Sequence, residues 1–182
     1  RPPRSTRGPD TTRGRAKRRR AAVGFLLLLL VPSCACSVQP PVTGSLCHAP
    51  ETTYFSCRTT RHTTVSLCGT LPSNLQYRYG KGAQVELQFP DDPATGARRL
   101  GYAHYSRFRV DRTEVTFSHV DADYAVFDYT ENDRRSAGVH VTTADGRESE
   151  VRCAGPVQGQ LAPLGKSLRC DSDNALNGGQ CP

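Results

Sequence analysis

The cysteines constrain this chain more than any other feature of its sequence. Eight occur in 182 residues, and six of them follow residue 37, at Cys47, Cys57, Cys68, Cys153, Cys170 and Cys181. None of the six belongs to a C-x2-C pair, the close spacing from which tetrahedral zinc sites are usually built. An even number of widely spaced cysteines in a small exported domain is instead typical of a disulfide framework. We therefore expect three disulfides, an oxidising compartment, and no metal or other cofactor.

A catalytic thiol is the alternative raised by the stretch CRTTRHTTVSLC, in which Cys57 and Cys68 flank His62. A reactive thiol needs its pKa lowered by a neighbouring base or a helix terminus. The polar segment RTTRHTT lies between two apolar runs, a pattern that favours a turn with His62 at its tip, facing solvent. The stretch therefore predicts a β-hairpin tied at its ends by cysteines.

The first 37 residues have the composition of an export leader. They carry nine of the 24 Lys and Arg residues but only one of the 17 acidic residues. KRRR at 17–20 precedes the apolar run 21–31, which is too short to cross a bilayer as a helix and has the length of the apolar core of a signal peptide. We expect residues 1–37 to be a basic leader and signal peptide.

Two processing sites compete at the end of this leader. VPSC at 31–34 resembles an imperfect lipobox, which would make Cys34 a lipidated N-terminus. The small residues ACS at 35–37 instead fit cleavage by ordinary signal peptidase after Ser37, which removes Cys34 and Cys36 and leaves an even cysteine count. Both routes predict a periplasmic or secreted protein, and the first also predicts a lipid anchor.

The charge of the remaining chain argues against nucleic acid as a partner. Residues 38–182 hold 15 basic and 16 acidic residues, so the body of the protein is nearly neutral. Binding to phosphate backbones needs a clustered basic surface. Membrane contact is expected only through a lipid on Cys34.

Short runs rich in Tyr, Phe, Val and Thr alternate with turn signals about every 8–12 residues, the pattern of an antiparallel β-sandwich or barrel. We expect eight to ten strands and no helix outside the leader. Pro90 and Pro93 make 90–99 a loop, because proline does not fit a central strand. The expected strands are 53–57, 64–68, 75–79, 83–89, 102–108, 113–119, 123–129, 137–142 and 148–153.

The domain organisation follows from these boundaries. Residues 38–50 are expected to be a linker and residues 51–154 a disulfide-stabilised all-β domain. The Gly- and Pro-rich residues 155–182 are expected to form an irregular tail, too far from the sheet for its cysteines to reach other partners.

The disulfide map follows from this organisation. First and last strands of such domains often become neighbours, since pairing them leaves fewer exposed edges. Cys57 should therefore pair with Cys153, and Cys170 should pair locally with Cys181. Cys47 and Cys68 then pair by elimination. The competing map joins Cys57 to Cys68 across their hairpin.

Catalytic constellations are weak in this sequence. The sequence contains Ser, His and Asp residues of the kind that an acyl-transfer site needs, but it has no G-x-S-x-G motif to present a nucleophilic serine. The aspartates that could act as a glycosidase pair flank a single predicted strand, and we interpret them as solvent-exposed residues. DSDN at 171–174 lacks the later Glu of a calcium loop and is interpreted as a turn. The residues concerned are Ser106, His104, His119 and Asp121 for acyl transfer, and Asp121, Asp123 and Asp128 for glycosidase chemistry.

A candidate binding patch lies within RRLGYAHYSRFR at 98–109, a stretch that combines arginines with Tyr, His and Phe side chains. Tyr and Arg are favoured anchors of protein interfaces, and the same mixture suits acidic glycans. The alternative is an ordinary strand with Tyr102 or Tyr105 turned inward. The candidate residues are Arg98, Arg99, Tyr102, His104, Tyr105 and Arg107.

The order YFSC, TVSLC, LQYRYG, GVHV and VRC resembles a family of uncharacterised small exported bacterial proteins over residues 47–153. A more distant resemblance is to the periplasmic or lipid-anchored inhibitors of C-type lysozyme, an all-β family. Tyr54, Phe55, Cys57 and Cys153 would hold the places of its aromatic-x-Cys strand and late cysteine. The inhibitory Ser-Gly loop of that family has no counterpart in YAHYSRFRV, so the resemblance implies no inhibitory residue.

The function expected from these observations is a non-enzymatic binding module of the cell envelope, with a protein or a glycan as its partner. A structural or accessory envelope lipoprotein is the alternative, and an extracytoplasmic hydrolase is a remote one.

Overall fold

The computed structural model describes residues 44–181, which all belong to one unit of the chain, Pro40–Pro182. The predicted signal peptide, its cleavage after Ser37 and the lipidation of Cys34 lie outside the described residues.

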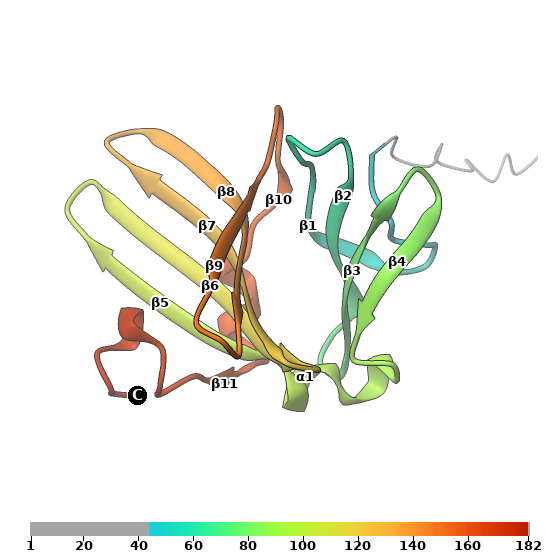
Figure 1. Cartoon of the computed structure of the whole chain (residues 1–182). Coiled ribbons are helices and arrows are strands. Elements are labelled where there is room, and N and C mark those ends of the chain that lie inside the picture. Colours follow the sequence, from blue (N-terminus) through green and yellow to red (C-terminus); the bar gives the residue numbers. More distant parts are fainter. Residues whose placement is uncertain (1–43, 182) are drawn as a thin grey trace, which may run out of the picture. The chain divides into compact units, whose positions relative to one another are not determined.

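Two β-sheets form the framework of this unit (Figure 1). Their orders are β10-β1-β2-β3-β4 and β11-β5-β6-β7-β8-β9, and all neighbours are antiparallel except β11 and β5. The predicted all-β class is confirmed, as two sheets rather than a closed barrel. The long strands are β1 (Thr52–Arg58), β2 (Thr64–Thr70), β3 (Asn74–Lys81), β4 (Gln84–Phe89), β5 (Gly101–Arg107), β6 (Val110–His119), β7 (Ala122–Glu131), β8 (Arg134–Thr143) and β9 (Glu148–Arg152).

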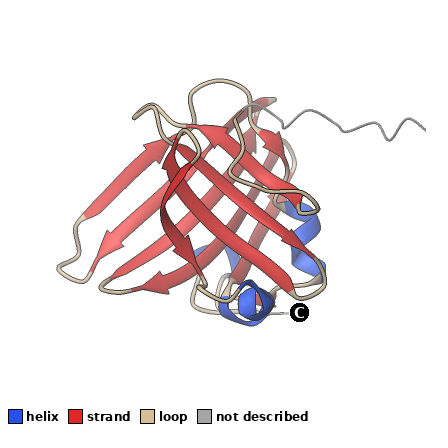
Figure 2. Ribbon diagram, turned by 90° about the vertical axis from the view of Figure 1, so that its right-hand side faces the viewer, coloured by secondary structure: helices blue, strands red, loops and turns tan. Residues whose placement is uncertain are grey.

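The connection from β4 to β5 differs from the loop predicted over 90–99. It contains the 3-10 turn η1 (Pro93–Thr95) and the short helix α1 (Gly96–Arg99) (Figure 2). Asp92 caps the turn by accepting a hydrogen bond from the Ala94 amide at 3.0 Å. A Cβ on Gly96 would lie 1.8 Å from the Leu75 carbonyl oxygen, so only glycine lets the helix approach β3 this closely.

The core lies between the sheets and is largely aromatic on one side. The Phe117 ring stacks on Phe89 with centroids 4.6 Å apart and on Tyr124 at 4.8 Å, and Tyr77 packs against it at 5.0 Å. The expected alternation in β3 is present on this face, since Leu75 and Tyr77 are buried in the core. The chain has no Trp or Met, and the rings of Phe and Tyr supply much of the apolar area in this part of the core.

The C-terminal tail is mostly irregular, as predicted, but its expected distance from the sheets is wrong. Leu161, Leu164 and Leu168 are buried in the common core. Leu164 lies on the 3-10 segment η2 (Ala162–Lys166), and Leu161 directly precedes it. Burying a leucine side chain stabilises a fold by about 1.5–3 kcal/mol. The tail also adds two short strands, β10 (Gln158–Gly159) beside β1 and β11 (Arg169–Cys170) beside β5.

Three disulfides cross-link the unit, and they are the three pairs that the sequence analysis predicts. They join Cys47 to Cys68, Cys57 to Cys153, and Cys170 to Cys181. Cys57 on β1 meets the end of β9, where Thr59 and Cys153 also form a backbone bridge, so this disulfide ties the two sheets together. His62 lies exposed in the β1–β2 turn, as predicted.

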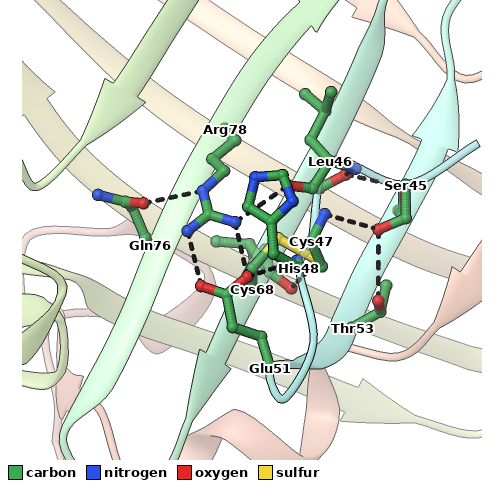
Figure 3. Close-up of a disulfide and its surroundings, with 12 residues drawn as sticks. Ser45, Leu46, Cys47, His48, Glu51, Thr53, Cys68, Gln76 and Arg78 are labelled. Atoms are coloured by element: carbon green, nitrogen blue, oxygen red, sulfur yellow. Dashed lines mark hydrogen bonds and ion pairs between the residues drawn. A yellow bond between two sulfur atoms is a disulfide. The ribbon is translucent and has the colours of Figure 1, made fainter. Parts of the chain in front are cut away.

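The segment expected to be a linker instead covers the outer face of the five-stranded sheet over its described part, 44–50 (Figure 3). Leu46 is buried there, and its amide donates to Ser66 Oγ at 3.0 Å. The Cys47–Cys68 disulfide fastens the segment to β2. Both faces of β2 and β3 are consequently buried, which explains why Gln76 and Arg78 are shielded from solvent.

Arg78 is the centre of this buried polar layer. Its guanidinium donates to both carboxylate oxygens of Glu51 at 2.6 Å, to the Leu46 carbonyl at 3.0 Å and to Gln76 Oε1 at 2.8 Å (Figure 3). Its side chain is only 9% exposed. These hydrogen bonds join Leu46 and Glu51 to Arg78 of β3, so the layer helps to hold the N-terminal segment on the sheet.

Candidate functional site

The candidate patch at 98–109 does not form one surface. Alternation along β5 sends Tyr102 and His104 to the inner face of the six-stranded sheet, where Tyr102 pairs with Val115 of the core. Tyr105 and Arg107 point to the opposite, outer face. Arg98 and Arg99 lie on α1.

Several members of the patch are engaged within the fold. The Tyr102 hydroxyl donates to the Ala162 carbonyl at 3.3 Å, and its ring lies so close to Gly165 that a Cβ there would approach within 2.7 Å. His104 Nε2 is 3.1 Å from Asp111 Oδ2, and the Arg99 guanidinium lies 5.0 Å above the Phe89 ring. Two large rings of the stretch 98–109 remain exposed to solvent, Tyr105 with 42% of its surface and Phe108 with 91%.

A larger concave site lies on the outer face of the six-stranded sheet, where the loop closed by Cys170 and Cys181 approaches β6, β7 and β8. Two adjoining cavities of about 510 and 850 Å³ share lining residues there. We call this pair of cavities the outer groove. Its shared lining consists of Ala125, His140, Thr142, Asp173 and Asn174.

Hydrogen bonds hold the tail loop in place over the sheet. The buried Glu114 carboxylate on β6 accepts hydrogen bonds from the Tyr129 hydroxyl and from Asn174 Nδ2, the latter at 2.6 Å. Thr116 Oγ1 donates to the Asp171 carboxylate. Asn174 Oδ1 also caps the 3-10 turn η3 (Ala175–Asn177) by accepting from the Leu176 amide at 2.8 Å. The tail wall of the groove is therefore fixed in position.

The pKa of Tyr129 is raised by burial and by its hydrogen bond to Glu114. The phenol therefore remains protonated across the physiological range and keeps donating to Glu114.

An imidazole ring forms the floor of the groove. His140 on β8 stacks on Phe127 of β7, with ring centroids 4.3 Å apart and an angle of 22° between the planes. Phe127 is itself buried, and Tyr129 approaches His140 edge-on at 6.5 Å. Phe127 covers one face of the imidazole, Glu150 Oε2 lies 4.0 Å from its Nε2, and His140 lines both cavities.

The groove carries more negative than positive side chains. Six carboxylates line it against the guanidinium groups of Arg99 and Arg169. Such a lining disfavours anionic ligands and offers acceptors to ligands with O–H or N–H donors. The carboxylates are Glu114, Asp123, Glu148, Glu150, Asp171 and Asp173.

Three further properties of the described residues bear on a possible function. Within residues 44–181, no three or more His, Cys, Asp or Glu side chains come together as a metal site would require. No helix in the same range has the length and apolar character needed to cross a bilayer. The three disulfides indicate an oxidising compartment outside the cytoplasm.

Sequence reasoning missed most of the groove. Residues 171–174 were expected to form a turn, and they do, with the Asn174 amide bonded to the Asp171 carbonyl at 3.3 Å. Nothing in their sequence placed them over the sheet. Nor did the sequence mark His140 as a site residue, because its stacking partner Phe127 lies on a different strand.

Comparisons of the chain with protein-family models, with curated proteins and with solved structures find no match.

Proposed function

We propose that the protein is a non-enzymatic binding module of the cell envelope, and that its outer groove holds a neutral or amino-sugar glycan. The observation that carries the proposal is the His140 ring, stacked on Phe127 and open to a groove of acceptor side chains. A flat ring offers apolar area to the C–H face of a sugar, while carboxylates and amides around it accept hydrogen bonds from sugar hydroxyls.

The charge of the groove narrows the ligand class. Asp123, Asp173 and Glu150 line the cavities that His140 lines, so the carboxylate of a uronate or the phosphate of a sugar phosphate meets repulsion there. Neutral N-acetylhexosamines and cationic hexosamines carry no negative charge and are not repelled by these carboxylates. This preference is the opposite of the acidic glycans that the arginines at 98–109 suggest from the sequence.

The first prediction concerns binding by the purified, disulfide-bonded protein. Isothermal titration calorimetry should show neutral chito-oligosaccharides and their de-N-acetylated, cationic forms binding with Kd below about 1 mM. Oligogalacturonate should bind at least about tenfold more weakly. His140→Ala should weaken the neutral ligand about tenfold, the range of one lost ring contact.

Asp173 provides a second variant with little risk to the fold. It is exposed, and its carboxylate has no hydrogen bond or ion pair within residues 44–181. Asp173→Ala should weaken the cationic oligosaccharide more than the neutral one. Asp121→Ala, an exposed carboxylate outside the groove, is the matched control and should change neither. Equal binding by all variants, or no binding of any oligosaccharide, would overturn the glycan proposal and favour the structural envelope protein.

Export is part of the proposal and rests on the basic leader, the apolar run 21–31 and the disulfides. The second prediction is that mass spectrometry of the protein from its host finds an N-terminus at Val38 or a lipidated Cys34. The first result assigns a free periplasmic or secreted form and the second an anchored lipoprotein. An intact leader on the disulfide-bonded protein contradicts export.

A further inference from the structure

A second cavity lies between the two sheets, away from the outer groove. It has a volume of about 330 Å³, near the lower limit of the roughly 300–1,000 Å³ typical of small-molecule sites. Its walls are mostly apolar or aromatic and come from β3 and β4 on one side and from β7 and β8 on the other. We call it the intersheet pocket; its main lining is Tyr77, Tyr79, Leu87, Tyr124, Val139 and Val141.

The hydroxyl of Tyr77 is the unusual group in this pocket. Tyr77 is only 2% exposed, with its ring held against Phe117 and Tyr124. Within residues 44–181, every fully buried side-chain nitrogen or oxygen has a hydrogen-bond partner. The Tyr77 hydroxyl has no such partner there, so it is not sealed in the core, and Tyr77 is one of the residues that line the intersheet pocket. A ligand oxygen that reaches this hydroxyl can form the hydrogen bond that the protein itself does not supply.

Burial raises the pKa of Tyr77 well above its ordinary value. The phenol is therefore neutral at any physiological pH, and it can either donate to a carbonyl or hydroxyl oxygen or accept from a hydroxyl.

The rim of the pocket is not selective for charge. Arg61 in the β1–β2 turn and Glu86 on β4 are the charged residues of its lining, and both are exposed. Their opposite signs leave no net attraction for an anion or a cation. The walls thus favour a neutral apolar body, and the hydroxyl favours one polar atom at its inner end.

We infer that the intersheet pocket binds a small neutral apolar molecule bearing a single hydroxyl or carbonyl group, which the Tyr77 hydroxyl hydrogen-bonds. This inference is independent of the glycan proposal, because it uses a different cavity, the inner instead of the outer face of the six-stranded sheet, and a different ligand chemistry.

The test compares two probes of nearly the same shape, 2-naphthol and naphthalene, by fluorescence titration of the purified protein. The wild type should bind 2-naphthol about two- to twelvefold more tightly than naphthalene, the range of one neutral hydrogen bond. Tyr77→Phe should abolish that difference and leave naphthalene binding unchanged. Its thermal stability should not fall, because the lost hydroxyl has no partner in the protein. Val141→Phe, which fills the pocket from a half-buried position, should abolish binding of both probes.

Asp173→Ala is the control, since it alters the outer groove alone and should bind both naphthyl probes like the wild type. Binding that survives Val141→Phe would place the probe elsewhere and overturn the inference. A wild-type protein that binds neither probe, or a preference for 2-naphthol that survives Tyr77→Phe, would also overturn it. None of these outcomes bears on oligosaccharide binding, so the two proposals fail separately.

Discussion

Replacing Cys57 and Cys153 together by alanine is expected to lower the free energy of unfolding by about 4–5 kcal/mol. Their disulfide closes a loop with a sequence separation of 96, so its removal frees the unfolded chain more than the loss of any shorter link. It also unties the corner where the sheets meet. At that corner, Thr60 N donates to the Arg152 carbonyl at 2.9 Å and Ala154 N donates to the Arg58 carbonyl at 2.6 Å.

The matched control is the double variant Cys170→Ala/Cys181→Ala. Its disulfide spans a separation of 11, for which the chain-entropy model gives about 3 kcal/mol or less. Urea unfolding of both variants, followed by tyrosine fluorescence, measures the difference. The control should lose oligosaccharide binding while remaining folded, because the tail loop forms one wall of the groove. Equal losses of stability in the two variants would contradict the assigned role of the Cys57–Cys153 link.

Arg78→Met is expected to lower the free energy of unfolding by about 3 kcal/mol. The substitution keeps most of the side-chain length but leaves the Glu51 carboxylate, held at 2.6 Å in the native protein, without its partner. It also leaves the Leu46 carbonyl without the guanidinium that donates to it. The double variant Arg78→Met/Glu51→Gln should recover part of the loss, since it removes both charges. Urea unfolding at neutral pH measures each value.

An exposed ion pair provides the control for Arg78. Arg152 donates to Glu150 at 2.6 Å on the outer face, with its side chain 72% exposed. Because such pairs are screened by solvent, Arg152→Met should change stability little. A loss as large as that of Arg78→Met would mean that burial does not set the strength of the Arg78 pair.

The same pair has a pH signature. Burial alone would raise the pKa of Glu51, but hydrogen bonds from Arg78 and from the His48 amide, together with the Arg78 charge, lower it below its ordinary 4.5. A carboxyl with a lowered pKa stabilises the fold above its unfolded-state pKa, and the contribution is lost as pH falls through the folded-state value. Stability of the wild type should therefore decline below about pH 4.5, and this part of the decline should be absent from Arg78→Met.

Most of the fold could be predicted because strands and turns are determined by short stretches of sequence. The alternation in segments such as 83–89 has a period of two, and proline and glycine mark the turns between them. The burial of Leu161, Leu164 and Leu168 could not be predicted in this way. Their spacing is i, i+3 and i+7, as on one face of a helix, but Pro163 and Gly165 lie within it and argue against a helix there. The sequence therefore does not predict that these leucines fill the core between the two sheets.

The candidate site illustrates a second limit of sequence reasoning. Residues 98–109 are rich in Arg and Tyr, but neighbours along a strand face opposite ways, and the structure separates Tyr102 from Tyr105. The outer groove instead gathers Thr116, His140 and Asp173 from segments far apart in the chain. Their proximity depends on the register of β6, β7 and β8 and on the path of the tail.

The most direct test of the central claim is a map of the glycan on the protein. In ¹H–¹⁵N correlation spectra titrated with chito-oligosaccharide, the largest shift changes should fall on amides of His140, Thr142, Asp173 and Asn174. Amides around Arg61 and Leu87, at the intersheet pocket, should remain in place. Shift changes confined to Tyr105, Arg107 and the following turn, or the absence of any change at saturating ligand, would contradict the assignment of the outer groove as the binding site.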